Sequence, residues 1–589
     1  MNRPWHRESD QVETIARATL SGFLESDLMP SGMQAPAMIW AAAFFVAPAL
    51  CLPAIAMIKY PFIRKYHPAM LEVAFWGDRL VFLLLSAGAM GLISVVLWDT
   101  LFPARRDAYV LAPMPIPLGI QMLGRLGGLV LLFAGFTVAL NAIPAVAYPA
   151  VAAGSFIDIP RAIAGHIVSA IAASAFVFFS VTSTQGLVIL VFGRRAAARL
   201  ASLAQVGAVL LFLLSLLFLD PVRGFVVDGL RRGDAAAPGL LWFPPAWFLG
   251  LYELIAGTPR PLMTSLAVRG VMAGAVPVAV TAAIYAFGYK RLLARAVEAP
   301  PRSSRSALIA LGSLAVRATF VRRPEEQAIC AFVLRAIGRS GRHSMMMSIY
   351  IGGGLALMAT SIIPAVARFG YEAFASPGVA MLSPPLVLSV ALAVGMRILM
   401  TIPVDLPARW IFQTTGLAPR RVDAAVNKSM LLLVVPPVAV FAGLSGWVLW
   451  GPAIAWRHAV FCACLTLVLC EVLLSTFKGS PMTRQYVPGR SRFHMWWAFY
   501  LTAFTTYCYT MAGFEAALLR KGGLLTASGV FVSLAFVSWL TRKIKLRDVD
   551  EVSFEVEALD EIFQGFNLTE AYAAQSVAPR ADGSAKFPV

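Results

Sequence analysis

The chain has 589 residues, of which 59% are apolar and only 14% charged, and its mean hydropathy is +0.74. A water-soluble globular protein carries about 25% charged and roughly 45–50% apolar residues, so this composition excludes that class and predicts an all-α polytopic membrane protein. The net charge of +18 could suggest nucleic-acid binding, but in a membrane protein basic residues first report orientation. We therefore expect a lipid membrane and no nucleic acid as partner.

The first 30 residues carry charges throughout and lack the short apolar core of a cleaved export signal. Apolar residues recur at helical spacing from Val12 to Leu24, opposite Glu13 and Arg17. This pattern predicts an amphipathic helix on the membrane surface. A helix of a small cytosolic cap is the alternative.

Twelve later segments each contain the roughly 20 mostly apolar residues that a spanning helix needs. They are 37–58, 80–98, 126–150, 163–192, 201–219, 265–288, 345–366, 381–402, 429–450, 459–477, 495–514 and 523–541. Another apolar segment, 241–257, is short and rich in proline and aromatic residues. We expect it at the outer surface or as a re-entrant piece.

Loop charges predict the orientation. With the amino terminus in the cytoplasm, the segment 290–343 lies inside and holds eleven Lys/Arg against three acidic residues. The remaining inner loops are also basic, although two predicted outer loops, 59–79 and 220–262, carry several basic residues and weaken the bias. The positive-inside rule therefore favours two cytoplasmic termini, as in a multi-pass protein of the cell's inner (cytoplasmic) membrane.

Two stretches of the chain are similar in sequence. The polar, proline-containing stretch 97–119 is matched by 401–425, with Asp99 and Asp405 separated by 306 positions. Each stretch lies between the second and third spans of a six-span set, and each set begins with an amphipathic segment. We therefore predict two parallel six-helix repeats. The expected parts are an amphipathic segment 1–30, a first half 31–300, a basic cytoplasmic amphipathic linker 301–344, a second half 345–547, and a cytoplasmic tail 548–589 that is first acidic and then disordered.

This arrangement resembles the ABC-2-type permeases, the membrane subunits of ATP-driven exporters. In that family the loop after the second span carries a short helix near the cytoplasmic ATPase subunit. The resemblance implies coupling loops at the two matching stretches. Their candidate residues are Asp99, Arg105, Arg106, Asp107, Pro113 and Pro115 in the first half, and Asp405, Arg409, Arg420 and Arg421 in the second. Alternatively, these arginines anchor the loops to anionic headgroups.

Catalytic motifs are absent from the sequence. It contains no G-x-x-x-x-G-K-[ST] phosphate loop, no H-E-x-x-H and no G-x-S-x-G. We therefore expect no enzyme activity and no cofactor in this chain. If it is an ABC permease, ATP and Mg²⁺ bind to a separate cytoplasmic ABC ATPase subunit.

Polar residues at membrane depth are candidates for function. These are Asn141, His166, Gln185, Arg397 and Glu471. Glu471 and Arg397 either pair with each other or reach towards the inner interface. The other three either line a translocation route or form interhelical hydrogen bonds. A lone histidine and the spacing of Cys462 and Cys464 predict neither a metal site nor a disulfide framework.

Two alternatives to the permease remain. A secondary, proton-coupled transporter of major-facilitator-like architecture also has two parallel halves, and 290–343 would be its central loop. The scarcity of acidic residues within the predicted spans argues against it. The other alternative is a membrane scaffold without transport. The sequence does not identify a substrate.

Overall fold

The computed structural model describes residues 4–24, 51–98, 100–103, 105–111, 113–153, 155–233, 237–257, 260–297, 320–402, 404, 414–415, 417–477, 481–483 and 493–546. Secondary structure in these ranges is entirely helical. The predicted tail 548–589, the part of the linker before 320, and the candidates Asp99, Asp405 and Arg409 lie outside the described residues.

The first half consists of long helices and a group of short ones. The long helices are a helix over 51–66, α3 (Leu71–Val96), α5 (Leu118–Ala152), α6 (Ile159–Phe192), α7 (Arg194–Leu217) and α11 (Pro261–Val297). The others are α1 (Pro4–Leu24), η1 (Pro68–Met70), α4 (Arg105–Leu111), α8 (Leu219–Arg232), α9 (Ala237–Leu241) and α10 (Pro244–Ala256).

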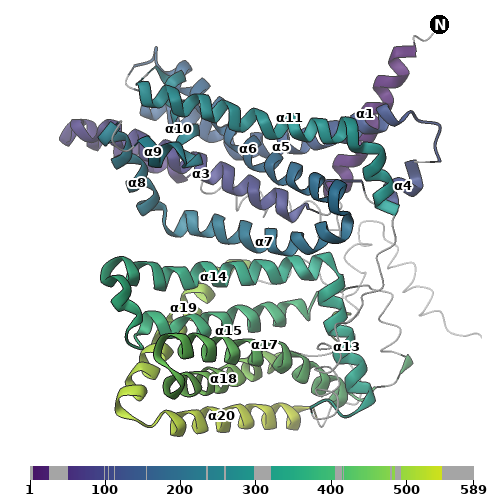
Figure 1. Cartoon of the computed structure of the whole chain (residues 1–589), viewed down its shortest axis with the longest axis vertical. Helices are drawn as coiled ribbons and strands as arrows, with labels where there is room; N and C mark the ends of the chain where they lie inside the picture. The colour runs from purple at the N-terminus through teal and green to yellow at the C-terminus, as the bar shows by residue number, and fades with distance from the viewer. Residues whose placement is uncertain are drawn as a thin grey trace, which may run out of the picture.

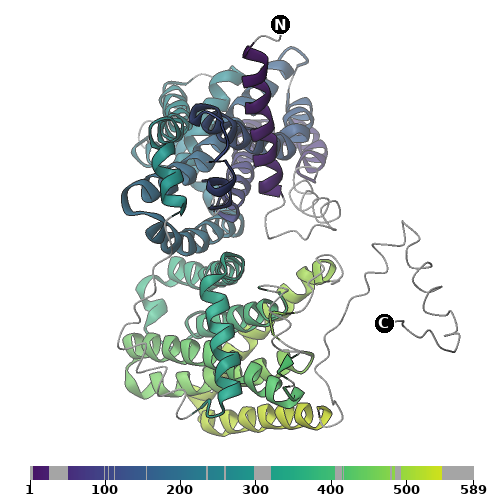
Figure 2. The ribbon, with the colours of Figure 1, turned by 90° about the vertical axis from the view of Figure 1, so that its right-hand side faces the viewer.

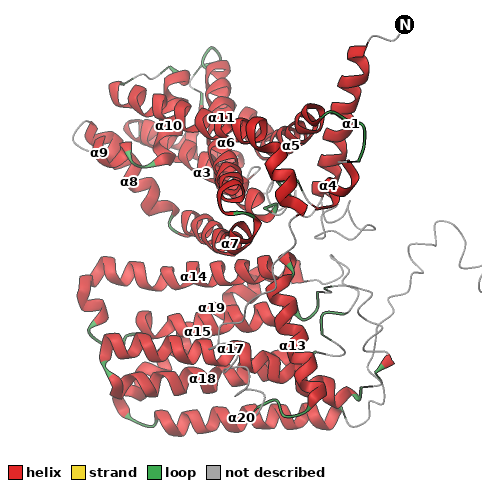
Figure 3. Cartoon of the chain, turned by 45° about the vertical axis from the view of Figure 1, so that its right-hand side comes forward, coloured by secondary structure: helices red, strands yellow, loops and turns green. Residues whose placement is uncertain are grey.

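The second half contains α13 (Pro324–Arg339), α14 (Gly341–Phe369), η3 (Gly370–Phe374), α15 (Val379–Leu399), α17 (Pro419–Trp450), α18 (Pro452–Leu474), α19 (Phe493–Lys521) and α20 (Leu524–Lys545). Figure 1 shows the two halves stacked on one another with their long helices running in a common direction. The helices α1, α4 and α13 lie near one end of the long helices, and α8, α9 and α10 lie near the other (Figures 1 and 3).

Nine helices in the described ranges are long and apolar enough to cross a membrane. A tenth candidate is the pair formed by α7 and α8, which is bent by 72°. The chain is therefore an all-α, multi-pass membrane protein. The predicted span 37–58 lies only partly within the described residues, and the predicted span 495–514 coincides with α19.

Several helices are longer than their apolar runs predict. We expected a span from residue 80, but α3 begins at Leu71 because Asp78 and Arg79 are paired inside the protein and do not end the helix. The 37 residues of α11 extend roughly 55 Å, well beyond a hydrocarbon core of about 30 Å. In contrast, α10 has only 13 residues, too few to span.

Each amphipathic helix packs on a long helix. The apolar stripe of α1 contacts α5, where Gly124 and Gly128 leave room for Ile15 and Thr19. In the second half, Ile329 and Val333 of α13 pack with Val422 of α17. Figure 2 shows α1 and α13 on the same side of the molecule. Packing against protein thus accounts for the stripe that predicted a surface helix.

The halves meet where α14 packs against α7. A Cβ on Gly352 would lie 2.9 Å from the carbonyl oxygen of Val206, so only glycine permits this approach. Within each half, two long helices are joined by a single residue: Gly193 between α6 and α7, and Gly451 between α17 and α18. Their φ angles of 83° and 82° favour glycine at both turns.

Candidate functional site

The first predicted coupling loop contains the short helix α4. Arg105, Arg106 and Asp107 form its first turn, and Pro113 and Pro115 lie in the exposed turn that follows. The Asp107 carboxylate pairs with the Arg125 guanidinium of α5 at 3.2 Å. Asp107, one of the predicted coupling residues, therefore forms an ion pair within the protein.

Three long helices hold the stretch that leads into α4 by its backbone carbonyls. Arg125 of α5 donates to the carbonyl of Phe102 at 3.2 Å, and Tyr285 of α11 donates to that of Leu101 at 2.6 Å. Gln185 of α6 donates to the carbonyl of Trp98 at 2.5 Å. Three long helices, α5, α6 and α11, therefore contact the backbone of this loop directly.

The exposed surface of this loop includes large apolar side chains. Tyr109 is 67% exposed, and Val110 and Met114 are also exposed. Large apolar side chains at an exposed loop are typical of a protein contact. We predicted the arginines of this loop as candidates but not these apolar residues. Tyr109 and Val110 follow the arginines within one short helix, and this proximity in the sequence could have indicated them.

The second predicted loop is partly described. Arg421 pairs with Glu325 of α13 at 2.6 Å, and Arg420 donates to the carbonyl of Leu546 at 3.3 Å. Lys428 pairs with Glu326, also at 2.6 Å. These basic residues fix α13 and the end of α20 to the start of α17.

Glu471 belongs to a buried charge cluster near the start of α17. It accepts hydrogen bonds from Asn427 of α17 at 2.6 Å and from Arg542 of α20 at 2.9 Å. Arg542 also pairs with Asp423 at 2.6 Å. The pairing that we considered between Glu471 and Arg397 is wrong: Arg397 donates to the carbonyl of Leu473. The true partner, Arg542, lies just after the predicted end of the last span. Membrane depth along the sequence therefore did not predict it as a partner of Glu471.

The other intramembrane candidates connect helices. Asn141 of α5 donates to Ser86 of α3 at 2.8 Å, and the Ser86 hydroxyl shares a hydrogen bond with Ser174 of α6. Gln185 contacts the loop before α4, as described above. The hydrogen bond of Asn141 is interhelical, whereas Gln185 connects α6 to a loop.

His166 lies in a different setting, an aromatic cluster near an ion pair. Its ring packs edge-on against Phe82 and Tyr252, and it is buried. Beside it, Arg79 of α3 pairs with Glu253 of α10 at 2.5 Å, with the guanidinium 4.5 Å from the Tyr252 ring centroid. This pair was not predicted, because Arg79 lies just outside the predicted span 80–98 and the segment 241–257 was expected at the outer surface or as a re-entrant piece.

A third buried carboxylate was also missed. Glu515 of α19 accepts or shares a hydrogen bond with Nδ1 of His458 on α18, at 2.6 Å, and both side chains have no exposed surface. Cys462, four residues after His458, lies beside the same nitrogen. The predicted span ended at 514, one residue before this acid. Glu253, Glu471 and Glu515 are thus three carboxylates buried inside the protein.

No protein-family model, curated protein or solved structure matches the chain. The function proposed below therefore rests on the geometry of the described residues. All six cysteines are described and free.

Proposed function

We propose that the chain is the membrane-spanning permease subunit of an ATP-driven, ABC-type exporter and that it couples a separate ATPase to substrate translocation. The observation that carries this proposal is the construction of α4. It is a short helix between the second and third long helices, it exposes Tyr109 and Val110, and its approach is tied to three long helices by carbonyl hydrogen bonds.

The proposal includes twelve spans in two fused, parallel six-helix halves. Two features support it. In each half an amphipathic helix, α1 or α13, packs on the third long helix, α5 or α17. The fourth long helix of each half also begins alike, with a proline followed six residues later by a buried histidine: Pro160 with His166, and Pro452 with His458.

In this proposal, the mechanism is mechanical. ATP and Mg²⁺ bind to two cytoplasmic ATPase subunits, whose approach displaces α4 and the corresponding second-half loop around Asp405 and Arg409. The hydrogen bonds from Arg125, Gln185 and Tyr285 pass the displacement to α5, α6 and α11. The two halves then alternate between inward and outward exposure of a substrate path.

Gentle purification followed by identification of copurifying proteins tests the proposal. We expect an ATPase with a G-x-x-x-x-G-K-[ST] motif, and we expect its loss from the Tyr109→Glu variant and from the Arg105→Glu/Arg106→Glu variant. Tyr371→Glu is the control, because Tyr371 is 92% exposed in η3, at the opposite end of the helices. Absence of such an ATPase from the wild-type preparation, or its retention in both loop variants, contradicts the proposal.

The buried carboxylates favour a second candidate, a proton-coupled secondary transporter. Glu253, Glu471 and Glu515 lie inside the helical bundle, where acids commonly serve proton relays. Transport in sealed vesicles distinguishes the two functions. Uptake or efflux that follows a proton gradient without ATP, and that is lost in Glu471→Gln, supports the second candidate and rejects the first.

A further inference from the structure

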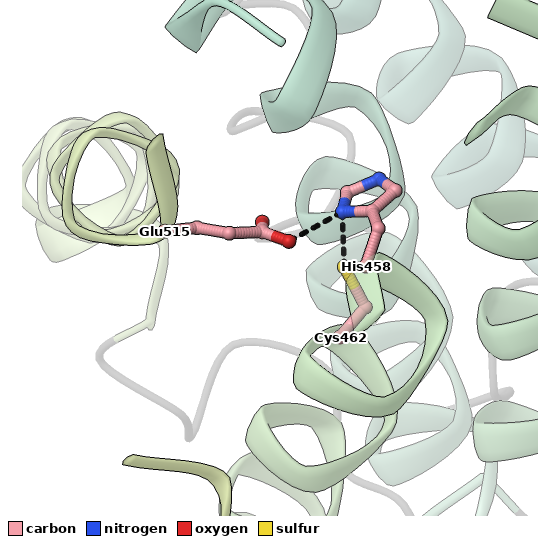
Figure 4. A group of neighbouring side chains, drawn as sticks. All are labelled: His458, Cys462 and Glu515. Atoms are coloured by element: carbon pink, nitrogen blue, oxygen red, sulfur yellow. Dashed lines mark hydrogen bonds and ion pairs between the residues drawn. The ribbon is translucent and has the colours of Figure 1, made fainter. Parts of the chain in front are cut away.

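Three side chains from two helices of the second half converge on one point. His458 and Cys462 are four residues apart on α18, so they share one face of the helix. Glu515 approaches that face from α19 (Figure 4). Nδ1 of His458 is 2.6 Å from Oε1 of Glu515 and 3.6 Å from Sγ of Cys462.

The convergence has the chemistry of a transition-metal site. Imidazole, thiolate and carboxylate are the ligands that zinc takes in proteins, whereas magnesium and calcium prefer oxygen ligands alone. One potential ligand atom from each residue lies within 4.8 Å of the other two. Metal–ligand distances for zinc are about 2.0–2.3 Å. Displacements of the three ligand atoms by about one ångström or less, through small side-chain rotations, therefore suffice to place an ion between them.

Burial supports a divalent ion in particular. All three side chains are completely buried or nearly so. A buried group with net charge is strongly disfavoured, but a divalent cation held by one thiolate, one carboxylate and a neutral imidazole has no net charge. A bound cation therefore allows the Cys462 thiol and the Glu515 carboxyl to be ionised at a buried position that disfavours either charge without a counter-ion.

An unsatisfied atom provides a separate indication of a ligand. Oε2 of Glu515 is buried and has no hydrogen-bond partner within the described part of the chain. Buried carboxylate oxygens are normally paired. A metal ion beside Oε1 can also take Oε2, because carboxylates bind metals through one or both oxygens.

The imidazole is held in place by its neighbours. The Trp450 ring meets the His458 ring at 74°, with 6.1 Å between centroids, and the Trp450 indole donates to the carbonyl of Phe374 at 3.0 Å. The imidazole thus packs against an aromatic ring, while its other nitrogen, Nε2, is buried without a hydrogen-bond partner in the described part of the chain.

We propose that His458, Cys462 and Glu515 form a buried binding site for a divalent transition-metal ion of the zinc class. The ligands are Nδ1 of His458, Sγ of Cys462 and the Glu515 carboxylate. In the metal-bound form, Cys462 binds as the thiolate after releasing its proton to water, and His458 binds through an unprotonated Nδ1 with its ring proton on Nε2. His458 lies six residues from the start of α18, which is roughly 9 Å along the helix from the nearer end. This site is independent of the proposed transport function.

Cobalt(II) is the probe, because a cobalt–thiolate bond gives an intense near-ultraviolet absorption that cobalt bound to nitrogen and oxygen lacks. The full-length protein in detergent is titrated with Co²⁺ and then with Zn²⁺. We expect one equivalent of Co²⁺ per chain, the thiolate band, and its loss on displacement by Zn²⁺. Cys462→Ser should abolish the band, and Glu515→Gln should weaken Co²⁺ binding by at least about tenfold.

Cys464→Ser is the matched control, since Cys464 is two residues away on α18 and outside the cluster. It should keep the band and the stoichiometry. Size-exclusion chromatography of every variant verifies that the protein is folded. The proposal is overturned if the folded wild-type protein shows no thiolate band at a tenfold excess of Co²⁺. It is also overturned if Cys462→Ser keeps the band.

Discussion

At the scale of single residues, buried ion pairs connect parts of the chain that are far apart in sequence. Arg79 and Glu253 are 174 positions apart, and Arg542 lies 71 positions from Glu471 and 119 from Asp423. Such pairs are costly to desolvate, and their removal as a pair can be neutral, but removal of one partner leaves a buried charge without compensation. Each of these groups is therefore more sensitive to single than to paired substitution.

We predict that Glu253→Gln lowers the free energy of unfolding by about 3–5 kcal/mol, because Arg79 then remains buried without a counter-charge. The measurement is reversible unfolding of the purified protein in mixed micelles. Glu72→Gln is the control: its pair with Arg260 is about half exposed, so the loss should stay within ~1 kcal/mol. Equal effects of the two substitutions would contradict a special role for burial.

The residues that we predicted from sequence differ in a consistent way from those we missed. Asn141, Gln185 and Glu471 stand out because each is polar within an apolar run. Arg79 and Glu515 were missed because each lies one residue outside a predicted span, and Glu253 because it lies in the short segment 241–257, where we expected no buried charge. Their burial depends on α10 and α19 packing against other helices, which periodicity along one segment does not reveal.

At the scale of helices, the packing of α1 on α5 depends on two glycines. A Cβ on Gly124 would lie 2.6 Å from Ile15, and a Cβ on Gly128 would lie 2.6 Å from Thr19. Both distances are too short for real atoms, so α1 must move if either position gains a side chain. The α1–α5 contact is thus set by small residues, as is common between closely packed helices in membranes.

We predict that Gly128→Ala weakens the docking of α1 by about 1–3 kcal/mol, the usual cost of overpacking. Amide hydrogen exchange in α1 should then accelerate roughly ten- to hundredfold if exchange follows undocking. Gly135→Ala is the control on the same helix, because no atom lies within 4 Å of its added Cβ. Unchanged exchange in Gly128→Ala would show that α1 is held by something other than this contact.

Hydropathy predicted the existence of the long helices better than their ends. Apolar runs indicated α5, α6, α11, α15, α17, α18 and α20 correctly, because each needs a continuous apolar surface towards lipid or core. The run 201–219 indicated α7, which ends at Leu217, but not the 72° bend into α8, because hydropathy does not report the direction of the segment that follows. The change of direction comes from the amphipathic α8, whose Val226 and Leu230 pack with α3 residues such as Leu80.

At the scale of the whole molecule, the two halves are held at the α7–α14 contact. Gly352 lies against the backbone of α7, whereas its neighbour Gly353 approaches only Leu213, at 3.7 Å. Adjacent glycines therefore have different roles: one sets the distance between the halves, and the other lies at an ordinary contact.

We predict that Gly352→Ala destabilises the association of the halves by about 1–3 kcal/mol, and that Gly353→Ala is neutral or slightly stabilising because alanine favours the helix. The check is a protease site inserted into 301–319, followed by chromatography after cleavage. Wild-type and Gly353→Ala halves should co-elute, while Gly352→Ala halves should separate at lower temperature or denaturant. The same separation in both variants would refute this assignment.

The one-residue turn at Gly451 bears on how the chain is assembled during synthesis. Because a single residue joins α17 and α18, the entropy cost of bringing the two helices together is small. Their contacts also join residues that are close in sequence. We therefore expect this hairpin to form as soon as both helices have left the ribosome. Contacts such as Arg79 with Glu253, separated by 174 positions, must wait for much later segments. In the second half, the α17–α18 hairpin then provides an early surface for α15 and α20.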